Sequence, residues 1–122
     1  TALANPREVA MKIPLILTGG AIAHPMKIKL IGSQQDIAAT LLGQLGVEHK
    51  DFLFSKNMLS DATPKFAFFT VNDAFGVVSE ENSLIFDNKS KKVLYDKGTK
   101  PGYNIKRGQA YLQKLYDDIS TK

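Results

Sequence analysis

The 122-residue chain contains no cysteine, no tryptophan and only two histidines. Without cysteine, disulfide bonds and thiolate zinc sites are excluded, although cysteine-free chains suit a cytoplasm, a periplasm or a cell surface equally well. No apolar run approaches the ~18 residues of a membrane-spanning helix, and the N-terminus lacks a signal peptide's basic start and long apolar middle. The composition, 43% hydrophobic and 23% charged, is that of one ordinary globular domain.

The charge of the chain is mildly basic and dispersed. Sixteen Lys and Arg stand against twelve Asp and Glu, and only Lys89, Lys91 and Lys92 form a short basic run. A nucleic-acid-binding surface would gather basic and aromatic residues on one face, so we expect no nucleic-acid partner. The chain begins with Thr1 rather than methionine, which suggests a trimmed or processed polypeptide.

Two extended segments are predicted before residue 32. Residues 13–17 are apolar at every position and end at Thr18-Gly19-Gly20, a pattern typical of a strand buried on both faces. Pro14 fits near the start of such a strand, because it cannot donate to a ladder. Residues 26–31 alternate lysines with apolar residues, which indicates a half-exposed strand or extended segment.

The stretch SQQDIAATLLGQLG, residues 33–46, predicts a short amphipathic helix. Ser33 and Asp36 form a capping-box-like start, and Gly46 supplies the stop. The expected inward stripe consists of Ile37, Ala38, Leu41, Leu42 and Leu45. We interpret the helix chiefly as a packing element.

The second half of the chain predicts an antiparallel meander of about four strands followed by a helix. Turn-forming residues separate four β-rich runs, residues 66–71, 75–78, 84–86 and 93–95. After the break at Lys100-Pro101-Gly102, a helix is expected from about Ile105 to Ile119, with Ala110, Leu112, Leu115, Tyr116 and Ile119 facing inward. The fold class is therefore α+β: buried strand, amphipathic helix, meander and C-terminal helix.

Residues for catalysis are scarce. The chain has no HExxH motif, no GxSxG elbow and no paired histidines on a helix face. His49 follows a helix end and fits a solvated loop residue. His24 follows a Gly-Gly turn after the predicted buried strand, where α/β folds place ligand groups, so it is the candidate substrate-binding residue beside a plain loop interpretation. We predict no catalytic residue and no metal ligand in this chain.

Three further motifs allow a structural and a chemical interpretation. Gly19-Gly20 could cradle an anion but fits a tight turn better, since no Lys-Ser or Lys-Thr helix start follows. Asp36 could serve as a base or metal ligand, but helix capping already explains its position. Ser55-Lys56 could suggest a Ser-Lys pair, although no partner motif accompanies it.

Three stretches of the sequence, KIPLILTGG, GSQQDIAATLLGQLG and FSKNML, occur in an order that resembles a known family. These stretches resemble the C-terminal part of proteins in the sulfatase-like, lipoteichoic-acid-synthase-like branch of the alkaline phosphatase superfamily. The resemblance is greatest to Bacteroidetes-type members. The resemblance continues through FAFFTVNDAFG and the closing AYLQKLYDDI, and so covers nearly the whole chain.

The resemblance implies that residues 1–122 are a single C-terminal subdomain of a larger enzyme with an alkaline-phosphatase-like α/β fold. That family uses a Thr nucleophile, or a modified Cys or Ser in true sulfatases, and a divalent metal: manganese, zinc, magnesium or calcium. Those motifs would lie upstream of Thr1, because this chain contains no Asp-His-Gly or Asp-His-Tyr sequence. The parent would be an extracytoplasmic phosphoglycerol transferase or sulfatase-like hydrolase, anchored in the membrane by its own N-terminal segment.

Two partners follow from this interpretation: the upstream catalytic domain and, for the separate chain, a second copy bound through the N-terminal third. The alternative is a self-sufficient binding or assembly module that uses the meander surface. A complete module should pair or cover every strand edge, whereas a fragment should leave one apolar strand unpaired.

Overall fold

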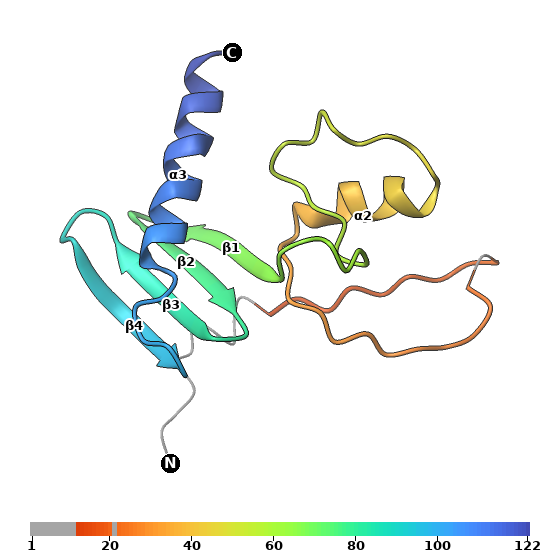
Figure 1. Cartoon of the computed structure of the whole chain (residues 1–122), viewed down its shortest axis with the longest axis horizontal. Coiled ribbons are helices and arrows are strands. Elements are labelled where there is room, and N and C mark those ends of the chain that lie inside the picture. The colour runs from red at the N-terminus through yellow and green to blue at the C-terminus, as the bar shows by residue number, and fades with distance from the viewer. Residues whose placement is uncertain (1–11, 21) are drawn as a thin grey trace.

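The computed structural model describes residues 12–20 and 22–122. Thr1, from which a processed start was inferred, lies outside the described residues. Within these ranges a short helix precedes a four-stranded sheet and a long C-terminal helix (Figure 1). The elements are α2 (Asp36–Gln44), β1 (Phe66–Val71), β2 (Ala74–Ser79), β3 (Asn82–Asp87), β4 (Lys92–Gly98) and α3 (Ile105–Ser120). The predicted α+β class is confirmed.

The sheet is an antiparallel meander in which strands that are neighbours in sequence also pair, in the order β1-β2-β3-β4. Each predicted β-rich run lies within one strand. Asn72 and Asp73 form the two-residue turn between β1 and β2, and Asn72 adopts a left-handed φ of 48° that asparagine tolerates. The predicted turn chemistry therefore fixes the register of the first hairpin.

The hydrophobic core lies between one face of the sheet and the first half of α3. Its buried residues come from three strands: Phe68, Phe75, Val77, Leu84 and Phe86. Ile105, Tyr111 and Leu112 of α3 pack against them. The helix approaches β2 closely at Gly108, where any side-chain Cβ would overlap the ring of Phe75. A glycine inside a helix costs up to about 1 kcal/mol against alanine, and here it permits this contact.

The inward stripe predicted for α3 is correct only in part. Leu112 packs on the core and Leu115 is half-buried, but Ala110, Tyr116 and Ile119 are exposed. The reason is that α3 continues beyond the sheet after its first half (Figure 1). Its later apolar residues therefore have no sheet beneath them.

The inward stripe predicted for α2 is correct only in part, because Ile37, Ala38 and Leu42 are half-buried but Leu41 and Leu45 are exposed. Its buried residues are Asp36, Ala39 and Thr40, whereas Leu41 is 42% and Leu45 75% exposed. The helix turns its polar side toward residues 55–58, which supply hydrogen-bonding partners, and Leu41 outward. Its end follows the sequence prediction, because Gly46 has φ 68° and the amides of Gly46 and Val47 bond back to Gly43 and Leu42.

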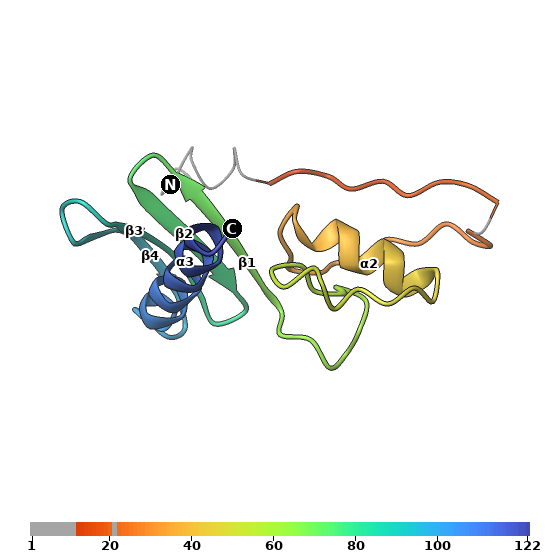
Figure 2. The ribbon, with the colours of Figure 1, turned by 90° about the horizontal axis from the view of Figure 1, so that it is seen from above.

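The buried strand predicted at residues 13–17 is also absent. Residues 12–20 and 22–31, here called the extended arm, contain no strand and are exposed at all positions but the last. Ile13 is 70% and Ile16 79% exposed, because no described segment pairs with them or covers them. Figures 1 and 2 show the arm reaching away from the sheet and turning back toward the start of α2. Residues 26–31 do not form a strand either. They are an extended segment, which was the second of the two structures expected for them.

Candidate functional site

The two histidines are not brought into a reactive arrangement. His24 is exposed on the extended arm, and no hydrogen bond or ion pair to it exists within the described ranges. His49 lies in the loop after α2, as predicted, but it is half-buried rather than fully solvated. Across residues 12–20 and 22–122, no cluster of three or more His, Asp or Glu side chains could hold a metal ion.

The most buried charged group in the described chain is Asp36, at the start of α2. The residue is 1% exposed, and its carboxylate forms an ion pair with the ammonium of Lys56, whose side chain is 17% exposed. Oδ1 accepts the backbone N–H of Lys56 at 3.1 Å, and Oδ2 accepts that of Ser33 at 2.7 Å. Only half of the predicted capping box is present: Asp36 binds the Ser33 N–H, but Gln35 is the N-cap of α2 without a side-chain cap bond, and Ser33 Oγ binds Phe68 instead. Lys56 is a partner that sequence spacing did not indicate.

Three hydroxyl groups around this ion pair bind the backbone. Ser33 Oγ accepts the N–H of Phe68 at 2.7 Å and donates to its carbonyl at 3.0 Å, so it occupies the free edge of β1. Ser55 Oγ accepts the N–H of Ala39 at 2.9 Å. Thr40 Oγ1 donates to the Asp36 carbonyl and accepts the N–H of Met58.

These contacts join α2, the loop at residues 55–58 and β1. Ser55 and Lys56 do not form a nucleophile and base, because each is engaged by a different part of α2. No buried side-chain nitrogen or oxygen within the described residues lacks a partner. We call this set of contacts around Asp36 and Lys56 a clasp, because it holds α2 against the loop and β1.

A second clasp holds the start of α3 against the sheet. Asn104 is completely buried and donates through Nδ2 to the Asn82 carbonyl at 2.6 Å and to Ser79 Oγ at 3.1 Å. The Asn104 N–H donates to Asn82 Oδ1, and Asn82 Nδ2 donates to Asp96 at 2.6 Å. The sequence analysis missed these asparagines because their partners lie 14 to 25 residues away.

Tyr111 connects α3 to the part of the chain around α2. Its phenol donates to the Phe54 carbonyl at 3.1 Å and accepts from Gln35 Nε2 at 2.7 Å.

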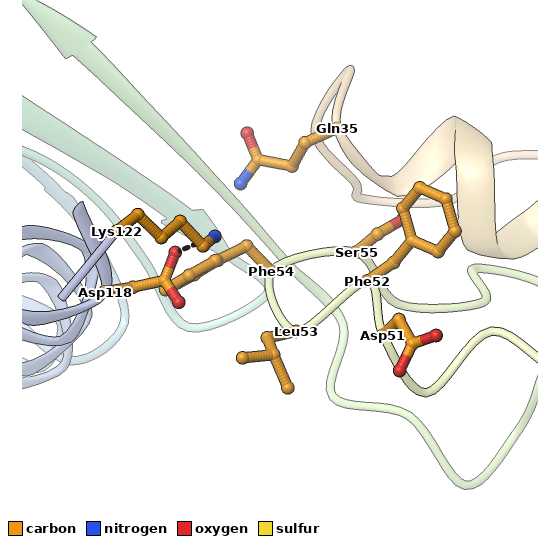
Figure 3. A pocket seen from close by; sticks show the side chains of 8 residues that line it. All are labelled: Gln35, Asp51, Phe52, Leu53, Phe54, Ser55, Asp118 and Lys122. Atoms are coloured by element: carbon orange, nitrogen blue, oxygen red, sulfur yellow. Dashed lines mark hydrogen bonds and ion pairs between the residues drawn. The ribbon is translucent and has the colours of Figure 1, made fainter.

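A shallow depression of about 230 Å³ lies beside this connection, and Figure 3 shows the side chains that line it: Gln35, Asp51, Phe52, Leu53, Phe54, Ser55, Asp118 and Lys122. Asp118 and Lys122 bind each other at its rim, while Asp51 lies apart from them. The depression contains no nucleophile beside a base.

Tyr111 also gives a pH-dependent prediction. Burial raises the pKa of its phenol, the Gln35 hydrogen bond opposes that shift, and nearby Asp36 adds to it. The neutral phenol is thus favoured in the fold, and its contribution to stability is present below about pH 10 and is lost as pH rises through the folded pKa. In a pH titration followed by tyrosinate absorbance, one tyrosine should ionise at higher pH than the others. Tyr111→Phe should remove this high-pH step, and Tyr116→Phe should keep it. Its persistence in Tyr111→Phe would contradict this assignment.

Comparison of the chain with family models, curated proteins and solved structures finds no match. Within the described part of the chain no helix is long and apolar enough to cross a membrane. The polar groups described above hold elements of the fold together.

Proposed function

We propose that this chain is the C-terminal structural subdomain of an extracytoplasmic, metal-dependent phosphoglycerol transferase or sulfatase-like hydrolase. The nucleophile and the ligands of its manganese, zinc, magnesium or calcium ion belong to the upstream catalytic domain. The membrane anchor belongs to the parent's N-terminal segment. The sequence resemblance motivates the proposal, and one structural observation supports it most: the apolar residues that should be buried are exposed.

Most of the exposed large apolar residues of the described chain belong to two segments, the arm and residues 41–47. The arm contributes Ile13, Leu15, Ile16, Leu17, Ile22, Met26, Ile28 and Leu30, and the end of α2 contributes Leu41, Leu45 and Val47. Burying one large aliphatic side chain stabilises a protein by about 1.5–3 kcal/mol. Soluble monomers rarely expose such a concentration of apolar surface, which marks an interaction site. An upstream sheet that pairs with the arm and receives the outer face of α2 would bury both groups.

The alternative is a self-sufficient module that binds through the meander. The observation in its favour is that Val93 and Leu94 of the edge strand β4 are 42% and 49% exposed. Val93 and Leu94 are the two exposed large apolar residues of the sheet, whereas the arm exposes eight. We therefore prefer the subdomain, whose partner is the upstream domain.

The proposal predicts that the separate chain is catalytically inactive. A metal-dependent ester hydrolase needs several converging ligands, and the described residues contain no such group. Aryl phosphate, aryl sulfate and phosphoglycerol lipid should show no turnover with added manganese, whereas a longer polypeptide carrying the upstream sequence should be active. Metal-dependent turnover by the separate chain that disappears in His24→Ala would contradict the proposal and make His24 a site residue.

A further prediction concerns association of the separate chain. An extended apolar segment without a partner is a template for pairing with another chain, so the arm should pair with the arm of a second copy. Sedimentation should show concentration-dependent association at micromolar protein. Ile16→Lys together with Ile28→Lys should abolish it, and Val93→Lys on β4 should not. Association that survives the double change and is lost with Val93→Lys would favour the meander module.

A further inference from the structure

Cationic side chains alternate with aromatic rings near the start of α3. Lys56 Nζ lies 4.5 Å from the centre of the Phe66 ring, and the Arg107 guanidinium carbon lies 5.4 Å from the same centre. Arg107 also lies 5.3 Å from the Tyr103 ring centre, and Lys100 Nζ lies 5.1 Å from it. The guanidinium of Arg107 is therefore held between two rings that restrict its orientation.

Arg107 has donors that the described protein does not use. The group is half-buried, and its one hydrogen bond runs from Nη1 to Asn104 Oδ1 at 3.5 Å, at the limit for such a contact. No carboxylate oxygen of the described residues lies within 4.0 Å of it. Lys56 differs, because Asp36 neutralises it.

The surroundings of Arg107 are electropositive. Lys100 and Lys106 are exposed nearby, and the first turn of α3 carries no acidic residue to offset the positive end of the helix dipole. Two acidic groups lie near this region, Asp96 and Glu81. Asp96 accepts the N–H of Gly102 at 2.9 Å and the side-chain amide of Asn82 at 2.6 Å. The backbone N–H of Glu81 and Ser79 Oγ lower the pKa of the Glu81 carboxyl most, and Lys100 and Arg107 lower it further. Glu81 is already engaged by Ser79 at 2.9 Å, so the donors of Arg107 remain available.

We propose that Arg107 binds the phosphate group of a phosphate ester, with Lys100 and Lys106 as flanking cations. A planar guanidinium held on aromatic rings presents two parallel N–H groups to one tetrahedral oxyanion, which a flexible lysine cannot do. The exposed Tyr103 ring, at 44%, lies where the organic part of the ester would pack. The site is independent of the proposed function, because it uses none of the arm or the outer face of α2.

The test is phosphorus NMR of glycerol phosphate and of inorganic phosphate, each with the whole 122-residue chain. Binding should broaden the ligand signal, and Arg107→Gln should weaken the affinity by about tenfold, the effect of losing one charge-assisted pair. Lys114→Gln removes the same charge from an exposed position farther along α3 and should leave binding unchanged. Arg107→Lys keeps the charge and should weaken binding, which preserves the test if the glutamine variant fails to fold.

A parallel experiment distinguishes the sources of the phosphate. Sedimentation with phosphatidylglycerol vesicles, and with phosphatidylcholine vesicles as the control, shows whether a lipid headgroup supplies it. Binding only to phosphatidylglycerol vesicles, lost in Arg107→Gln, would support the site and assign it to a lipid. No broadening and no vesicle binding, or equal losses in Lys114→Gln and Arg107→Gln, would overturn the proposal.

Discussion

Asp36→Ala should lower the free energy of unfolding by about 3–5 kcal/mol, the range for breaking a buried ion pair from one side. The change leaves the Lys56 ammonium largely buried without its counter-charge, and it removes the acceptor for two backbone N–H groups. Urea unfolding, followed by circular dichroism, measures the effect. The loss should exceed the ~1 kcal/mol of an ordinary helix cap.

The matched control is the exposed ion pair between Asp118 and Lys122. Asp118→Ala should cost less than about 1 kcal/mol, because Lys122 is 74% exposed and water replaces its partner. Asp36→Asn keeps an acceptor oxygen but not the charge, so its cost should fall between the two. Lys56→Met combined with Asp36→Leu should recover stability relative to Asp36→Ala. If Asp36→Ala and Asp118→Ala lowered the free energy of unfolding equally, the buried Asp36–Lys56 pair would not be a major source of stability.

Gly98→Ala should be the second strongly destabilising change, at about 3 kcal/mol or more. Gly98 ends β4 with φ 142°, a conformation that side chains rarely adopt and that costs about 1–3 kcal/mol. An added Cβ would also overlap the carbonyl oxygen of Glu81 and lie 2.8 Å from the Asn82 Cα. These are backbone atoms beside the Asn82 and Asn104 clasp, so they cannot move aside cheaply.

Thermal unfolding of Gly98→Ala against Gly20→Ala measures this effect. Gly20 lies on the exposed arm, where an added Cβ meets nothing within 4 Å, and its replacement should change stability by less than about 0.5 kcal/mol. Similar melting temperatures for the two variants would contradict the account of the β4 end.

The meander was predictable from the sequence because its signals are local. Turn formers such as Asn72-Asp73 separate the β-rich runs, and each run is short enough to act only as a strand. Gly46 likewise ended α2 as predicted, because a left-handed residue at a helix end depends on its own conformation. These features need no knowledge of what lies across the fold.

The errors came from elements whose orientation depends on a partner. The periodicity of α2 identified an apolar face, but whether that face is buried depends on what covers it. In the described chain the polar side of α2 has partners in Ser55 and Lys56, 16 to 20 residues away, and Leu41 and Leu45 face outward. Residues 13–17 failed as a strand for the same reason. These residues are apolar, but no segment of the described chain pairs with them or covers them.

Hydrogen exchange at residues 13–17 and 26–30 tests the central claim most directly. It should be measured on this chain, diluted until it is monomeric, and on the longer polypeptide that carries the upstream sequence. We predict that these amides exchange fast in the separate chain and as slowly as those of β2 in the longer one, while β2 itself is unchanged. Slow exchange in the dilute chain, or fast exchange in the longer polypeptide, would contradict the claim that an upstream domain covers the extended arm.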